Sequence, residues 1–154
     1  MTARELDATI HASAVLVGNL AVLIRGPSGS GKSRLALDLI LAGRGGVIAP
    51  AQLIGDDRVH LAVEAGTLVV RPAANLAGLL EVRGLGIRRL PFASHGQVGL
   101  VVDLDADDGA RLPAPGALEI GLNGVKLPRI PVGKSFAALP LVTAILVTSP
   151  LTVT

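Results

Sequence analysis

Eight consecutive residues near the start of the chain combine the residue types and the spacing needed to bind phosphate. They fill every fixed position of the pattern G-x-x-x-x-G-K-[ST], which is typical of a P-loop. The glycines allow backbone conformations in which successive N–H groups face phosphate oxygens, and the positive end of the following helix adds to the attraction. We expect Lys32 to contact the β- and γ-phosphates of a nucleotide and the Ser33 hydroxyl to bind Mg²⁺. The residues expected to bind the nucleotide are Gly26, Pro27, Ser28, Gly29, Ser30, Gly31, Lys32 and Ser33.

The apolar runs on either side of this loop predict the strand and the helix that a P-loop requires. Residues 20–24 are expected to form a short buried strand. Residues 35–42 are rich in Leu and Ala and predict a largely buried helix that ends at Gly43.

Phosphoryl transfer also needs carboxylates, one to help hold the metal ion and one to orient or deprotonate the attacking hydroxyl. Two acidic clusters follow apolar runs: Asp56 with Asp57, and Asp103 with Asp105. The second cluster has the cleaner apolar run ending in an acid, which is typical of a metal-binding strand end. The first cluster offers two adjacent carboxylates, one of which could serve as a general base. Acidic turns are also common on protein surfaces, so the pattern alone leaves the choice open.

The composition fits one α/β domain spanning residues 1–154. Hydrophobic residues make up 50% of the chain, but Phe92 and Phe136 are its only aromatic residues, so the core must consist of Leu, Val, Ile and Ala. A formal net charge of only +2 and the scarcity of aromatic stacking platforms argue against a nucleic-acid partner. The absence of cysteine excludes disulfides and thiolate chemistry, and no secretory signal is apparent, so we expect a cytoplasmic protein.

The uncharged segment at the end of the chain predicts a buried helix and no membrane span. No charged residue occurs from Phe136 to Thr154, but Pro140 and Pro150 interrupt the segment. A membrane-spanning helix needs about 20 apolar residues in sequence. We therefore expect a helix over residues 141–147, whose apolar surface suits a subunit interface, and no membrane partner.

The remaining apolar runs predict a mixed sheet. Residues 14–17 and 20–24 are expected to form a hairpin around Gly18 and Asn19, and residues 58–63 and 67–71 a second hairpin. Further strands are expected at 47–48 or 52–54, and at 99–104, 116–122 and 126–132, with a helical turn at 76–80. The predicted fold class is α/β: a P-loop nucleotide-binding domain with a mixed, partly antiparallel sheet flanked by helices.

A third cluster carries a resemblance to a known family. The run Glu-Val-Arg-Gly-Leu-Gly-Ile at Glu81–Ile87 resembles the signature of the bacterial HPr kinase/phosphorylase family, and the resemblance extends to Gly26–Ser33, Asp56–Arg58 and Pro128–Ser135. It implies an ATP-dependent serine protein kinase that uses Mg²⁺, phosphorylates the phosphocarrier protein HPr, and dephosphorylates phosphoserine-HPr with inorganic phosphate. It also implies a homo-hexamer, here as a short form with the catalytic domain alone.

The same resemblance implies roles for individual residues. Ser33 and Glu81 would bind Mg²⁺, and Asp56 or Asp57 would exchange a proton with the acceptor serine. His11 and Arg111 match further catalytic positions beside Lys32. The dephosphorylation loop falls on residues 130–135, where a lysine replaces the usual arginine and lacks its planar fork. The residues expected to contact the acceptor protein or inorganic phosphate during dephosphorylation are Arg83, Gly84, Gly86, Arg129 and Lys134.

Two other functions are compatible with a P-loop. A small-metabolite kinase would use Asp103 and Asp105 beside the metal ion. A non-catalytic nucleotide-binding module would need none of the acidic residues.

Overall fold

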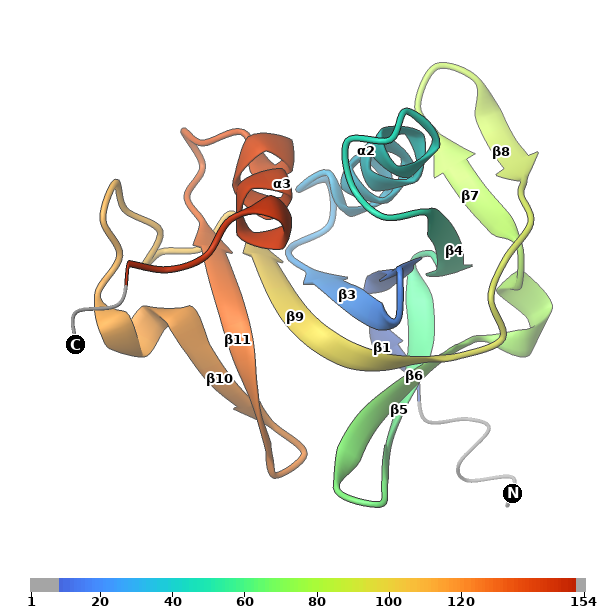
Figure 1. Ribbon diagram of the computed structural model, residues 1–154. Helices are drawn as coiled ribbons and strands as arrows, with labels where there is room; N and C mark the ends of the chain where they lie inside the picture. The colour runs from blue at the N-terminus through green and yellow to red at the C-terminus, as the bar shows by residue number, and fades with distance from the viewer. Residues whose placement is uncertain (1–8, 152–154) are drawn as a thin grey trace.

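The computed structural model describes residues 9–151, which form a curled sheet with two helices packed on it (Figure 1). The strands of the sheet are β1 (Thr9–His11), β2 (Ser13–Val17), β3 (Leu20–Arg25), β4 (Ala51–Gly55), β5 (Arg58–Glu64), β6 (Thr67–Pro72), β9 (Gly96–Leu104), β10 (Glu119–Leu122) and β11 (Val125–Val132). A separate hairpin consists of β7 (Leu79–Val82) and β8 (Gly86–Arg89). The helices are α2 (Lys32–Arg44) and α3 (Ala138–Val147), and two short 3₁₀ turns are η1 (Ala74–Leu76) and η2 (Pro115–Leu118).

The sheet is mixed, as the sequence predicts. Its order is β1-β5-β6-β9-β3-β2-β4, and β11, with β10 beyond it, pairs with β9. The pairs β3–β9 and β9–β11 are parallel, whereas the other pairs are antiparallel. The carboxyl ends of β3, β9 and β11 therefore lie at the same edge of the sheet, and the loop that follows β3 is the predicted phosphate-binding loop.

The two ends of the strand order meet at one corner of the curled sheet. Only Ala12 separates β1 from β2, and only Asp56 and Asp57 separate β4 from β5. The pairings His11↔Arg58 and Ala14↔Gly55 follow one continuous antiparallel register, which places Ala12 opposite Asp57 and Ser13 opposite Asp56. The Ala12 N–H donates to the Asp57 carbonyl at 3.2 Å across this corner. The acidic pair thus occupies the point where two bent strands change direction together.

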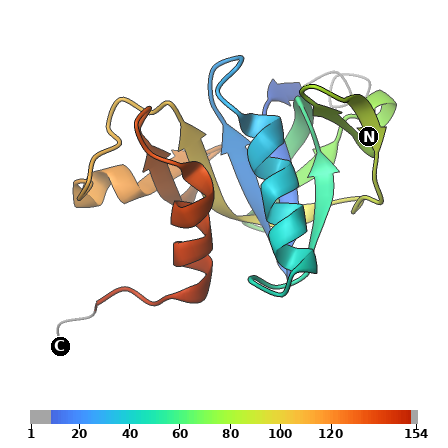
Figure 2. The ribbon, with the colours of Figure 1, turned by 90° about the horizontal axis from the view of Figure 1, so that it is seen from above.

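The core has two layers because the strands alternate their side chains between the faces of the sheet. On β3, Val22 and Ile24 face α2 and α3, whereas Ala21 and Leu23 face the inside of the curled sheet. Both helices lie side by side on the same face, as Figures 1 and 2 show. The other face is covered by strands, so the helices flank the sheet on one face only. The core is aliphatic as predicted, and Phe92 and Phe136 are both exposed.

Most predicted elements are present with small shifts at their ends. Both expected hairpins form, and the second of the two alternative sites (52–54) lies within β4. The C-terminal helix starts three residues early at Ala138, but the expectation of a buried helix is wrong, because Val142 is the only buried residue of α3. Pro140 fits in its first turn, where the backbone N–H groups need no helical partner. Helix α2 extends past Gly43 to Arg44. Of residues 116–122, only Glu119–Leu122 form a strand, because η2 precedes them.

The helical turn expected at residues 76–80 is wrong. The spacing of Leu76, Leu79 and Leu80 suits a helix, but the 3₁₀ turn ends at Leu76 and Leu79 begins β7. Gly78 adopts a φ of 76°, which ends the turn, and its carbonyl accepts a hydrogen bond from the N–H of Leu90 at 2.8 Å. Pairing with β8 therefore overrides the local helical pattern.

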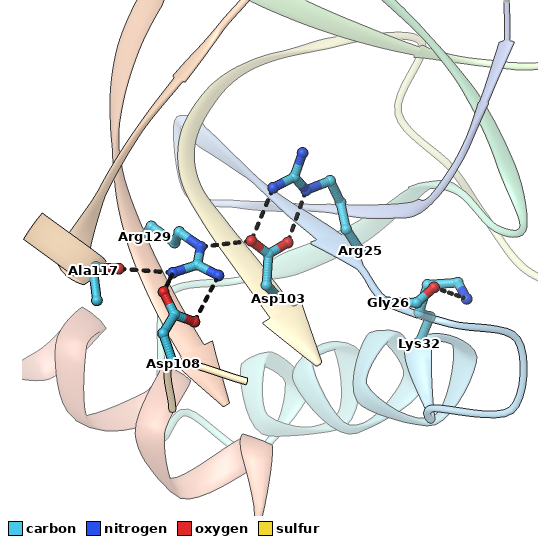
Figure 3. A network of polar contacts seen from close by, with 7 residues as sticks. All are labelled: Arg25, Gly26, Lys32, Asp103, Asp108, Ala117 and Arg129. Carbon is cyan, nitrogen blue, oxygen red and sulfur yellow. Dashed lines mark hydrogen bonds and ion pairs between the residues drawn. The ribbon is translucent and has the colours of Figure 1, made fainter. Parts of the chain in front are cut away.

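A network of charged side chains fastens the three parallel strands just below the phosphate-binding loop (Figure 3). The carboxylate of Asp103 on β9 accepts hydrogen bonds from the Arg25 Nε at 2.7 Å and from the Arg129 Nε at 2.6 Å. Arg129 also binds Asp108 and the Ala117 carbonyl. Burial raises the pKa of Asp103, but the hydrogen bonds and charges of the two arginines outweigh this effect and hold the pKa below its ordinary value.

No helix within residues 9–151 is long and apolar enough to cross a membrane.

The Asp103 network predicts a pH-dependent stability difference. We expect Asp103→Asn to lower the free energy of unfolding by about 2–3 kcal/mol near neutral pH, because it removes a partly buried charge shared by two arginines. A carboxylate with a lowered folded-state pKa stabilises the fold above its unfolded pKa and loses that contribution as the pH falls through the folded value. The difference between the two proteins should therefore shrink below about pH 4 in urea titrations. Asp107→Asn, which changes an exposed acid in the loop after β9, is the control, and a constant difference down to about pH 2 would contradict the assignment.

Candidate active site

The loop between β3 and α2 is shaped to receive an anion. Gly29 and Gly31 adopt φ values of 82° and 100°, which favour glycine. Gly31 is also the N-cap of α2, and the helix has neither a side-chain cap nor an acidic residue in its first turn. Its first backbone N–H groups are thus not bound by a capping side chain, and the helix dipole favours negative charge there.

Two side chains of the loop are held inside it. Lys32 is only 7% exposed, and its Nζ donates to the carbonyl of Gly26 at 2.9 Å (Figure 3). It also donates to the carbonyl of Pro27 at 3.1 Å. The Ser30 Oγ is buried and has no hydrogen-bond partner among the described residues. Buried hydroxyls normally have a partner, so this oxygen is a group that a bound ligand could satisfy.

The carboxylate of Asp56 joins this loop to two other elements. It is 5% exposed and accepts hydrogen bonds from the Ser13 Oγ at 2.7 Å, the Ser33 Oγ at 2.8 Å and the Glu81 backbone N–H at 3.2 Å. The three donors come from β2, α2 and β7. Asp56, which the sequence did not distinguish from Asp57, is therefore in direct contact with Ser33, the last residue of the phosphate-binding motif.

Asp57 lies next to Asp56 but in a different environment. The Arg58 N–H donates to the Asp56 carbonyl at 2.8 Å, and Asp57 between them has a φ of 70°, as in a tight three-residue γ-turn. This turn leaves the Asp57 side chain 62% exposed, with its Oδ1 at 3.0 Å from the His11 Nε2. The corner thus gives one buried carboxylate and one accessible carboxylate in consecutive positions.

These residues surround a cavity of about 670 Å³ beside the loop. Its walls come from β1, the loop, the start of α2, the corner and the β7–β8 hairpin. Arg83 reaches over the loop, since its Nη2 would lie 3.7 Å from a Cβ placed on Gly29. The lining residues are His11, Ser28, Gly29, Ser30, Gly31, Lys32, Ser33, Arg34, Leu37, Asp38, Asp57, Glu81, Val82 and Arg83.

The donor set fits a nucleotide with a magnesium ion. Backbone N–H groups, Lys32 and Arg83 suit phosphate oxygens, and the oxygens of Ser33, Asp56 and Glu81 are of the kind that Mg²⁺ prefers. No cluster of three or more His, Asp or Glu side chains gathers as a metal cage within residues 9–151. Magnesium in phosphoryl-transfer sites needs only one or two carboxylates besides the substrate phosphates, so this arrangement is sufficient.

Comparison with known proteins gives the family of this fold and site. The family model of the HPr serine kinase C-terminal domain matches residues 4–97. The chain belongs to this family. The matched segment contains every residue that lines the cavity and ends before Asp103.

Relatives of this HPr serine kinase C-terminal domain agree with the assignment. The HPr kinase/phosphorylase of Streptococcus thermophilus is 38% identical over 133 residues, which cover 79% of this chain and 41% of the relative. That of Streptococcus agalactiae is 34% identical, with 79% and 40% covered. The chain thus spans about two fifths of the length of these curated relatives. The solved structure of the Hpr(Ser) kinase/phosphatase from Coxiella burnetii has a TM-score of 0.70 and 27% identity, and the match covers 92% of this chain and 94% of that one.

Not all of the sequence-predicted residues lie at the cavity. His11, Lys32, Ser33, Asp57, Glu81 and Arg83 line it together with Ser28, Gly29, Ser30 and Gly31, and Asp56 lies directly behind Ser33. Gly84 and Gly86 shape the turn of the β7–β8 hairpin with φ values of 89° and 110°. Arg129 binds Asp103 and Asp108, and Arg111 lines a second pocket beside α3. Lys134 is exposed and lines neither pocket.

Sequence reasoning missed three polar contributors, Ser13, Arg34 and Asp38. Ser13 holds Asp56, and the only signal for this is the continuous register that sets the two residues opposite each other. Arg34 and Asp38 line the cavity from one side of α2, and their spacing of four residues on a helix starting at Lys32 could have indicated a shared face.

The two acids of the corner are expected to respond oppositely to substitution. Asp56→Ala should lower the free energy of unfolding by about 2–4 kcal/mol, because it leaves buried donors from three elements without an acceptor. Asp57→Gly should leave it unchanged or raise it by up to about 1 kcal/mol, because glycine removes the strain of a positive φ. Guanidinium titrations followed by circular dichroism measure both, and a larger loss for Asp57→Gly than for Asp56→Ala would contradict this description of the corner.

Proposed function

We propose that this chain is an ATP-dependent serine protein kinase that phosphorylates the phosphocarrier protein HPr. The observation that supports it best is the contact between Ser33 and Asp56, which brings the phosphate-binding loop and the acidic corner into one cavity. Membership of the HPr serine kinase family supports HPr as the acceptor. A non-catalytic nucleotide-binding module would have no use for an exposed, strained carboxylate beside the phosphate loop.

In the proposed reaction, the loop N–H groups, Lys32 and Arg83 hold the triphosphate of ATP and offset its charge. Ser33, Asp56 and Glu81 would hold Mg²⁺, which neutralises phosphate charge when bound. Asp57 accepts the proton of the acceptor serine hydroxyl, and His11 orients Asp57 through its Nε2. The serine oxygen then forms a bond to the γ-phosphorus while the bond to the β–γ bridging oxygen breaks, which releases ADP.

The same residues can serve the reverse direction. An oxygen of inorganic phosphate attacks the phosphorus of phosphoserine-HPr, and the protonated Asp57 returns its proton to the serine oxygen as the phosphorus–oxygen bond breaks. The products are HPr and pyrophosphate. Because the acid and the base are one side chain, a single accessible carboxylate is sufficient for both directions.

The division of labour between the two corner acids follows from their environments. Asp56 is buried and already accepts three donors, so its role is to position Ser33 and complete the metal site. Asp57 is accessible from the cavity, and among the described residues 9–151 its carboxylate pairs only with His11. We therefore assign the proton transfer to Asp57.

The small-metabolite kinase is not favoured. That interpretation needs Asp103 as a metal-side acid, but both of its carboxylate oxygens accept arginine hydrogen bonds. Within residues 9–151, neither Asp103 nor Asp105 lines the cavity or hydrogen-bonds a residue that lines it, as Asp56 does through Ser33. A carboxylate neutralised by two arginines is a poor ligand for a cation.

Transfer of label from γ-labelled ATP to purified HPr in the presence of Mg²⁺ tests the proposed function. Asp57→Asn should lower the transfer rate at least 100-fold and leave ATP affinity within about twofold, because a general base contributes about 10²–10⁴ to the rate. Lys32→Ala should weaken ATP binding itself, as measured by calorimetry, since it removes a phosphate-binding charge. Asp107→Asn is the matched control. Label on HPr that persists in Asp57→Asn, or label on small molecules without HPr, would exclude the proposed mechanism.

A further inference from the structure

The β7–β8 hairpin exposes apolar side chains that its own stability does not explain. All four residues of β8 are exposed, and Ile87 among them is 63% exposed. Leu85, which precedes the strand, is 65% exposed. The two strands pair only with each other, and the hairpin is attached to the core through β7, where Leu80 packs below α2. Within residues 9–151, β8 gains no core contact from these apolar residues, although isolated two-stranded hairpins are marginally stable. Exposed apolar side chains of this kind indicate a surface that binds another molecule.

The pairing register puts one of these residues at the rim of the nucleotide cavity. Ile87 is the direct partner of Glu81, and antiparallel partners stand side by side on the same face of a hairpin. Glu81, Val82 and Arg83 line the cavity. Along the same face, the next pair is Leu79 with Arg89. An apolar and then a cationic side chain thus continue the wall of the cavity outward from the site of transfer.

We propose that Ile87 and Arg89, together with Leu85 in the adjoining turn, form the docking face for the acceptor protein, which we call the hairpin face. This inference rests on the proposed kinase function and adds to it the surface that receives the acceptor. A serine that reaches Asp57 must bring its surrounding surface against the cavity rim, and a small metabolite would not extend to Ile87. The hairpin carries three arginines and one glutamate between Leu79 and Arg89. The occupant is therefore a protein whose phosphorylatable serine is bordered by exposed apolar side chains and by an acidic group that pairs with Arg89.

The test measures acceptor binding separately from transfer. Ile87→Ser and Leu85→Ser are each made in the native protein and in the Asp57→Asn variant. Binding of HPr to the Asp57→Asn double variants is measured by calorimetry with ATP and Mg²⁺ present. Val63→Ser is the matched control, because Val63 is 48% exposed on the β5–β6 hairpin, at the opposite end of the molecule (Figure 1). All three sites are exposed, so each variant should fold, and thermal unfolding checks this.

We expect Ile87→Ser to weaken HPr binding and to raise KM for HPr by about 10-fold or more, with kcat and ATP affinity nearly unchanged, since burial of one such side chain is worth that much. Leu85→Ser should act in the same direction, and Val63→Ser should have no effect. Wild-type transfer with an unchanged KM for HPr in Ile87→Ser would overturn the hairpin face and leave the kinase intact. HPr binding that depends on Ile87 without any transfer would support the docking face and overturn the catalytic proposal. If HPr neither binds nor accepts phosphate, both proposals fall.

Discussion

The arrangement of the site depends on one buried carboxylate. Asp56 accepts hydrogen bonds from a strand, from the first turn of the helix after the phosphate loop and from the backbone of the β7–β8 hairpin. A buried charge is costly, and the cost is offset only when donors surround it, so these three elements must converge on this point for the fold to be stable. Because the donors include Ser33 and the backbone of Glu81, the same constraint that stabilises the corner also brings the proposed metal ligands together.

The corner also explains how two neighbouring acids acquire different environments. The bent segments 9–14 and 55–60 keep one register through the corner, and the tight turn at Asp56 and Asp57 accommodates the bend. Once Asp56 is fixed inward by its donors, the γ-turn directs the next side chain to the cavity at the expense of a positive φ. The strain at Asp57 is thus tied to the anchoring of Asp56, and neither residue can be understood from its own contacts alone.

The sequence predicts the parts whose signal is local. The P-loop, its strand and helix, and both hairpins follow from residue types within a few positions, because glycines, turn pairs and apolar runs act locally. The choice between Asp56 and Asp103 does not follow, since each acid ends an apolar run and the difference lies in distant partners. Arg25 is 78 positions away from Asp103, and Ser13 is 43 positions away from Asp56. The prediction of a helical turn at residues 76–80 is wrong for the same reason, because Leu79 pairs with β8 and Leu80 packs against α2.

Asp103 and Asp56 differ in the groups that hydrogen-bond to their carboxylates. The parallel neighbour of the P-loop strand often supplies the metal-side acid, and Asp103 stands there, directly opposite Arg25 in the register. Arg25 and Arg129 pair with its carboxylate, so Asp103 joins β3, β9 and β11. The antiparallel corner places another acid, Asp56, against the phosphate-binding motif, and its own donors are neutral hydroxyl and amide groups. Neutral donors hold a carboxylate in place without cancelling its charge, so Asp56 keeps the negative potential that a cation requires, whereas Asp103 does not.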